Sequence, residues 1–271
     1  MSQHQSDTHS TWHMLGSFGA LPIPVQNAVN KLSSKVESNP DHFYMRGYVP
    51  LLLDARRKMA QFIGADLDEI VMIPNTSLGI TVVLRNLDWE AGDTLISCKV
   101  LRIVKLTGCS LLCETVNTSY TTIINTFRTI AESPPYPTLA QFVVQFPTTH
   151  VEIVTAFEEY IKALPRTEGK KVIAVIDSIH STPGVAMPWK ELVKICKRFR
   201  ILSIVDASHS IGQEPGINLS QADPDFWVSV KLLQLEMPHS LTFIRSELLQ
   251  VVVWEAAMWS ILCSKKVSLV F

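Results

Sequence analysis

The sequence has no uncharged apolar run of the roughly 20 residues that a membrane-spanning helix needs, so we expect no membrane anchor. It also lacks an excess of positive charge, because 24 Lys and Arg stand against 25 Asp and Glu. Nucleic-acid binding through phosphate neutralisation is therefore not expected. Charged residues make up only 18% of the chain, against a usual value of about 25%. The 47% of hydrophobic residues allow a substantial core, which excludes global disorder.

Motifs of several common enzyme classes are absent as well. No G-x-G-x-x-G follows a predicted strand, and there is no G-x-x-x-x-G-K-[ST], G-x-S-x-G or H-E-x-x-H. The five cysteines are irregularly spaced, so we expect reduced core thiols and no metal site. Residues 1–13 have neither the apolar segment of a secretory signal nor the arginines of a mitochondrial presequence. We therefore expect a cytoplasmic protein whose first 13 residues form a disordered tail.

What is present is an alternation of predicted helices and strands along the 271 residues. Apolar residues at helical spacing predict two helices between about Pro22 and Gly64, separated at Pro40. The predicted strands are 69–73, 94–98, 142–146, 171–176, 202–205 and 226–229, and further helices are predicted over 75–85, 150–164 and 189–198. This order is typical of an α/β fold with a mainly parallel sheet and helices on both faces.

Polar residues follow several of these strands, at the sheet edge where α/β proteins bind ligands. Asp206 and His209 follow strand 202–205, either as a helix cap and a satisfied histidine or as groups that hold a heteroaromatic ligand. Thr76 and Ser77 follow strand 69–73 at a helix start, which suits a phosphate but is also the composition of an ordinary N-cap. The polar segment 177–184 would line the same crevice.

These residues belong to a longer series of motifs that covers about residues 14–98 and 118–229. The series includes Pro74-Asn-Thr-Ser77 with Gly79, Phe146-Pro-Thr-Thr-His150, Val205-Asp-Ala-Ser-His209 and Asp223-Pro-Asp-Phe-Trp-Val-Ser229. In its residues and order it resembles the class V aminotransferase family of pyridoxal-phosphate (PLP) enzymes. Within that family the chain is most similar to isopenicillin N epimerase-like proteins and to fungal hercynylcysteine sulfoxide lyases.

The resemblance implies a PLP-dependent transferase-like (fold type I) large domain over residues 14–229, an amino-acid substrate and a homodimer. Residues that it assigns to the cofactor are Thr76, Ser77 and Ser229 at the phosphate, Asp206 at the pyridinium nitrogen, His209 near the phenolic oxygen and Tyr120 stacked on the ring. A carboxylate that keeps the ring nitrogen protonated makes the ring an electron sink. The implied activity is that of a C–S lyase of the hercynylcysteine sulfoxide lyase type, or of an epimerase.

The match to the family has two gaps. Residues 99–117 form an atypical insertion, and residues 230–271 form a tail without a family counterpart where the family continues into a small domain. The family's Schiff-base lysine follows the strand that ends at Ser229; Leu233 takes that position here, and Lys231 is the candidate catalytic lysine. The alternative is a catalytically inactive, truncated or mis-spliced PLP-fold protein that lacks the lysine motif.

Overall fold

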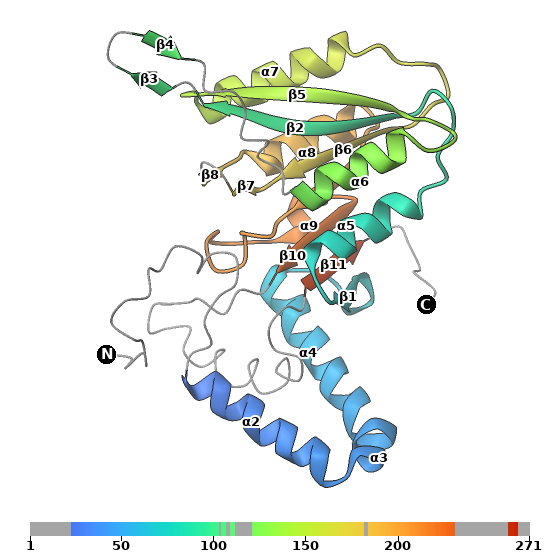
Figure 1. The fold of residues 1–271 in the computed structure, drawn as a ribbon, viewed down its shortest axis with the longest axis vertical. Helices are drawn as coiled ribbons and strands as arrows, with labels where there is room; N and C mark the ends of the chain where they lie inside the picture. Colours follow the sequence, from blue (N-terminus) through green and yellow to red (C-terminus); the bar gives the residue numbers. More distant parts are fainter. Residues whose placement is uncertain are drawn as a thin grey trace.

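A seven-stranded sheet forms the centre of the computed structural model, which describes residues 23–102, 104–106, 109–111, 121–181, 184–230 and 260–264 (Figure 1). In spatial order its strands are β1 (Ile70–Ile73), β11 (Ser260–Ser264), β10 (Phe226–Val230), β9 (Leu202–Asp206), β6 (Val172–Asp177), β2 (Thr94–Arg102) and β5 (Thr138–Phe146). The strands from β10 to β5 pair in parallel, whereas β11 is antiparallel to both β10 and β1. The predicted α/β fold with a mainly parallel sheet is confirmed.

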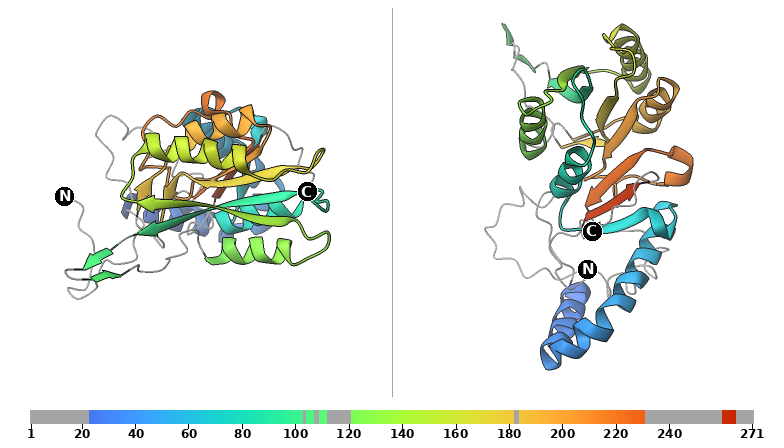
Figure 2. Two further views of the ribbon diagram at one scale, coloured as in Figure 1. Left: turned by 90° about the horizontal axis from the view of Figure 1, so that it is seen from above. Right: turned by 90° about the vertical axis from the view of Figure 1, so that its right-hand side faces the viewer.

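Helices cover both faces of this sheet. In Figure 2, α5 (Thr76–Arg85) and α6 (Thr121–Ala131) lie on one face, and α7 (His150–Ala163) and α8 (Trp189–Arg198) lie on the other. The short α9 (Leu219–Ala222) packs on the α7–α8 side. Every residue of β6 is buried, because alternate side chains enter two separate cores. A strand buried on both faces is what a parallel sheet between two helix layers requires.

The N-terminal helices form an arm that projects from the sheet (Figure 1). It consists of α2 (Ile23–Ser38), the single turn α3 (Pro40–His42), a π-helical turn (Phe43–Gly47) and α4 (Tyr48–Ile63). The end of α4 nearest the sheet packs into the core, and Gly64 ends the helix in the left-handed conformation at φ 64°. The two helices and the break at Pro40 are therefore as predicted, with the π-helical turn as an addition.

Three elements exceed what the sequence pattern predicted. β2 continues to Arg102, because residues 99–102 pair in parallel with β5, so the expected insertion 99–117 begins inside a strand. The helix α6 has buried apolar residues at helical spacing but was not predicted. β11 comes from the expected tail 230–271 and fills the gap between β1 and β10. The domain boundaries themselves stay predictions.

Two two-stranded hairpins lie outside the main sheet: β3 (Val104–Leu106) pairs with β4 (Cys109–Leu111), and β7 (Ile179–His180) pairs with β8 (Val185–Ala186). The second one follows β6 directly, so it stands beside the carboxyl edge of the sheet. Among the helices that the structure describes, none has the length and apolar character needed to cross a membrane.

Candidate functional site

The carboxyl ends of four strands meet at one edge of the sheet. Asp206 at the end of β9 is the register partner of Asp177 in β6 and of Val228 in β10. β11 pairs Ser260 with both Ile73 and Val230, so the end of β1 is level with the end of β10. This register brings five of the predicted site residues to the same edge: Thr76, Ser77, Asp206, His209 and Ser229. Lys231 and Tyr120 lie outside the described residues.

The helix α5 begins at this edge with a capped, polar first turn. Asn75 is the N-cap, and its side-chain oxygen accepts the N–H of Leu78 at 2.7 Å. Thr76 is buried and Ser77 is half-buried in the first turn. The structure is therefore compatible with both interpretations of this segment, an ordinary N-cap and a phosphate site. Asn75 caps the helix, and the two hydroxyls lie at its N-terminus, where the backbone N–H groups favour an anion such as a phosphate.

Gly79 allows this helix start to lie against the sheet. A Cβ at this position would come within 2.3 Å of Cδ1 of Ile73 and 2.8 Å of Cγ1 of Val228. Both distances are far below van der Waals contact, so with a larger residue either α5 or the side chains of Ile73 and Val228 must move. The glycine in the motif thus sets the distance between the predicted phosphate-binding turn and the ends of the strands.

The carboxylate of Asp206 is held by its own loop. Its Oδ1 accepts the backbone N–H of Ser208 at 3.1 Å and the Ser208 hydroxyl at 2.6 Å. Burial, with the neighbouring Asp177 carboxylate as the second cause, raises the pKa of Asp206 to about 7. A carboxyl group in this state is stabilised in its charged form by a cation, and a protonated ring nitrogen is such a cation.

His209 and Ser229 complete the predicted set. Burial lowers the pKa of His209, which favours the neutral imidazole near pH 7. Ser229 is completely buried, and its hydroxyl donates to the carbonyl of Ala207 at 2.5 Å. The N–H of Ala207 in turn donates to the carbonyl of Val228 at 2.7 Å. Ser229 therefore ties β10 to the loop after Asp206, a structural task that the sequence did not reveal.

The donor set fits the group that the resemblance implies. A helix N-terminus with two hydroxyls, a carboxylate near its ionisation midpoint and a neutral imidazole match a phosphate, a ring nitrogen and a phenolic oxygen in turn. Within the described ranges, no group of three or more His, Cys, Asp or Glu side chains is arranged to hold a metal ion.

Asp177 and His180 are two further ionisable residues at this edge that the sequence analysis did not single out. His180 is completely buried, and its Nδ1 lies 2.6 Å from Oδ2 of Asp177. The sequence pattern predicts segment 177–184 in the crevice but indicates no role for either residue. The available signal was the one used for Asp206, namely an aspartate at the end of a wholly apolar strand.

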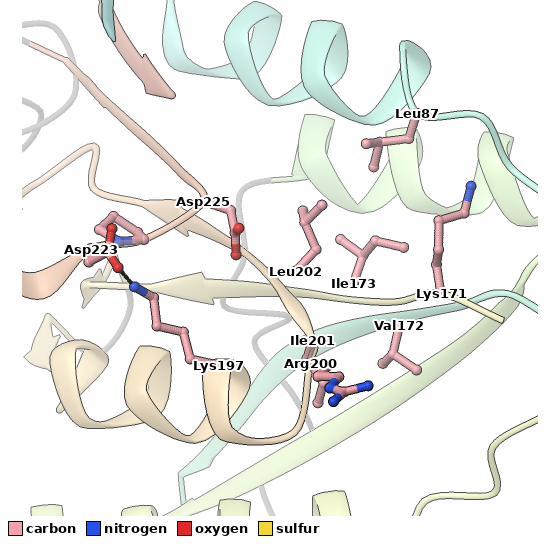
Figure 3. Close-up of a pocket in the computed structure, with 11 residues that line it drawn as sticks. Leu87, Lys171, Val172, Ile173, Lys197, Arg200, Ile201, Leu202, Asp223 and Asp225 are labelled. Carbon is pink, nitrogen blue, oxygen red and sulfur yellow. Dashed lines mark ion pairs between the residues drawn. The ribbon is translucent and has the colours of Figure 1, made fainter. Parts of the chain in front are cut away.

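A separate hollow of about 460 Å³ opens at the opposite, amino-terminal edge of the sheet (Figure 3). Its walls come from the starts of β6 and β9, and Lys197 and Asp223 form an ion pair across it. None of the predicted site residues is among its lining residues. The carboxyl edge therefore carries the candidate site.

Comparisons with known proteins bear on the fold and on the family that the chain resembles. No protein-family model matches the chain. An L-cysteine desulfhydrase-like protein of Epichloe uncinata is 29% identical over 230 residues, which are 84% of this chain and 45% of that protein. The hercynylcysteine sulfoxide lyase of Schizosaccharomyces pombe is 27% identical over 84% of this chain and 52% of its own length. The chain thus spans about half the length of these curated relatives.

A solved structure with the same fold is C-DES with glycine covalently linked to its PLP cofactor. The two superimpose with a TM-score of 0.66 at 15% identity, over 93% of this chain and 56% of C-DES. In sequence and in the fold of its large domain, the chain is therefore similar to the class V aminotransferase family, as the ordered motifs predict.

Proposed function

We propose that the chain is the cofactor-binding part of a PLP-dependent amino-acid enzyme, with C–S lyase activity on a sulfur-containing amino acid. The observation that carries the proposal is the convergence of Thr76, Ser77, Asp206 and His209 on the carboxyl edge of one sheet. The names of the relatives, desulfhydrase-like protein and sulfoxide lyase, support a lyase more than an epimerase or an inactive chain.

Each residue has a defined task in this proposal. The first turn of α5, with Thr76 and Ser77, holds the cofactor phosphate. Ser229 keeps its predicted contact with the phosphate and also ties β10 to the loop after β9. Asp206 keeps a proton on the ring nitrogen, and neutral His209 hydrogen-bonds the phenolic oxygen. When bound, PLP supplies the electron sink that makes a carbanion at the substrate α-carbon accessible. Tyr120 and Lys231 keep their predicted tasks of stacking on the ring and binding the cofactor covalently.

Titration with PLP tests the proposal directly. We expect the purified chain to develop a visible absorbance band, and borohydride reduction followed by peptide mass spectrometry to find the label on Lys231. The double substitution Thr76→Ala/Ser77→Ala should weaken PLP binding roughly tenfold or more, because hydrogen bonds to a charged group are lost. Sulfide release from L-cysteine is the activity readout.

The control is Thr155→Ala, which removes a hydroxyl from an exposed position of α7 and should leave PLP binding unchanged. Failure of the wild-type chain to bind PLP would favour the inactive alternative. A label on another lysine would overturn only the assignment of Lys231.

A homodimer is the second part of the proposal, and the arm supports it. Met45 is 83% exposed and Val49 is 52% exposed, and Ile23 and Leu53 add to the exposed apolar surface of the arm. Apolar surface of this kind commonly marks an interface. We expect sedimentation velocity to find a dimer and the substitution Met45→Glu/Val49→Glu to produce a monomer. A monomeric wild type at micromolar concentration would contradict the dimer. The cytoplasmic location stays a prediction.

A further inference from the structure

Two carboxylates stand side by side at the carboxyl edge. Asp177 ends β6, Asp206 ends β9, and the two are register partners on neighbouring strands. Asp177 is 7% exposed and Asp206 is half-buried, so water screens their repulsion only in part. Two carboxylates in such a position do not ionise independently, and one of them keeps a proton to a higher pH. A site that needs a charged Asp206 must therefore offset the charge of Asp177.

His180 is placed to do this. Its Nδ1 lies in ion-pair contact 2.6 Å from Oδ2 of Asp177, and in the described part of the chain both atoms are buried without a hydrogen-bond partner. The second ring nitrogen, Nε2, lies 3.9 Å from Sγ of Cys98. Burial raises the pKa of the Cys98 thiol, so this neighbour stays neutral. Asp177 is thus the charged group that His180 contacts.

The other groups around Asp206 do not replace this contribution. Among described residues, those that influence the pKa of Asp206 are Asp177, His180 and Ser208, without a lysine or arginine. His209, on the loop after β9, is shifted by burial toward its neutral form. Ser208 donates hydrogen bonds but has no charge. His180 is therefore the side chain among the described elements that contacts Asp177 and can carry a positive charge.

We propose that Asp177 and His180 form a charge-setting pair that favours the ionised form of Asp206. The imidazolium form of His180, with both ring nitrogens protonated, offsets the negative charge of Asp177. Asp206 can then take the negative charge that a protonated ring nitrogen requires. His180 acts through Asp177 and is a positioning residue. The role of the pair in cofactor binding rests on the proposed function. The charge coupling between the two carboxylates does not, because it can be measured in the cofactor-free chain.

NMR of the cofactor-free chain with ¹³C-labelled aspartate and ¹⁵N-labelled histidine tests the coupling. Carboxyl signals are assigned from Asp206→Asn and Asp177→Asn. We expect His180→Gln to raise the upper ionisation midpoint of the two carboxylates by about one pH unit, because a nearby opposite charge is lost. Asp177→Asn should lower the midpoint of Asp206 by about one to three units. In the Asp177→Asn background, His180→Gln should change that midpoint little.

A purely structural His180 would leave the midpoints in place, and an unchanged upper midpoint in folded His180→Gln overturns the proposal. Equal effects of His180→Gln with and without Asp177 also overturn it. If His180→Gln does not melt cooperatively, His180→Asn takes its place, and the ¹⁵N shifts of His180 in the wild type must show both ring nitrogens protonated at the pH where Asp206 ionises. A neutral ring, with one nitrogen deprotonated at that pH, contradicts the pair.

The affinity for PLP as a function of pH links the pair to the site. We expect the rise in PLP affinity with pH to move to higher pH in His180→Gln, in step with the NMR midpoint. A chain with the expected midpoints that binds no PLP contradicts the proposed function and leaves the charge-setting pair intact. A chain that binds PLP normally but whose ionisation midpoints do not move in His180→Gln contradicts the charge-setting pair and leaves the proposed function intact.

Discussion

Replacing Asp206 with asparagine is expected to make the cofactor-free chain more stable than the wild type at pH 8, by about 2 kcal/mol, and to change its stability little at pH 4. The same substitution should remove most of the activity of the PLP-loaded protein. The asparagine amide has the size of the carboxylate and keeps an oxygen that accepts the two hydrogen bonds from Ser208. The difference in stability therefore reports the charge of Asp206.

The expected gain in stability of Asp206→Asn at pH 8 follows from the pKa of Asp206, which is raised from 3.8 to about 7 in the folded chain. Between these values the folded state holds a proton that the unfolded state has lost, so stability falls as the pH rises from about 4 to about 7. Three pH units at 1.36 kcal/mol each give an upper bound of about 4 kcal/mol. Because Asp206 is partly exposed, solvent screening reduces this to about half.

Urea unfolding at pH 4 and pH 8 measures the effect. The control is Asp41→Asn, which makes the same change at an exposed carboxylate on α3, away from the carboxyl edge. Saturating PLP should reverse the order at pH 8, because a protonated ring nitrogen stabilises the charged Asp206 of the wild type only. A stability difference that is equal at both pH values would contradict the raised pKa.

The substitution Gly79→Ala is expected to weaken PLP binding at least tenfold and to destabilise the chain by about 1–2 kcal/mol. Helix propensity by itself predicts the opposite, because alanine in a helix is favoured over glycine by up to about 1 kcal/mol. A net loss of stability therefore reports the contact of the new Cβ with Ile73 and Val228. The phosphate-binding turn moves with the helix, which is why affinity should fall more than stability.

A double substitution separates the contact from other effects. Ile73→Val removes Cδ1, the atom that would lie 2.3 Å from the new Cβ, so Gly79→Ala/Ile73→Val should be less destabilised than the sum of the single changes. The control is Gly47→Ala in the π-helical turn, where the nearest atom to a Cβ is 3.2 Å away on the Phe43 ring. If the Gly79→Ala variant folds and its affinity for PLP is unchanged, the first turn of α5 does not hold the phosphate.

The residue pattern alone determined the fold class and most of the residues that lie at the candidate site. Alternating apolar periodicities gave the order of strands and helices, because they reflect local backbone geometry and one-sided burial. The polar residues directly after 69–73 and 202–205 identified Thr76, Ser77, Asp206 and His209 as neighbours, because parallel strands end at a common edge. The sheet topology and the structural comparison agree with the fold class. The register places the ends of these strands at one edge, and the roles of the residues there stay predictions.

Other features depend on contacts between distant segments, which a local pattern does not encode. Only the sheet register makes Asp177 a neighbour of Asp206. His180 reaches this edge through Asp177, which lies three residues before it in the chain. In the same way, β11 joins the sheet because two strand edges need a partner, not because its own residues show a distinctive period. The motifs determined which groups could bind a cofactor; the tertiary structure decided which charges act on them, since electrostatic coupling depends on distance and burial.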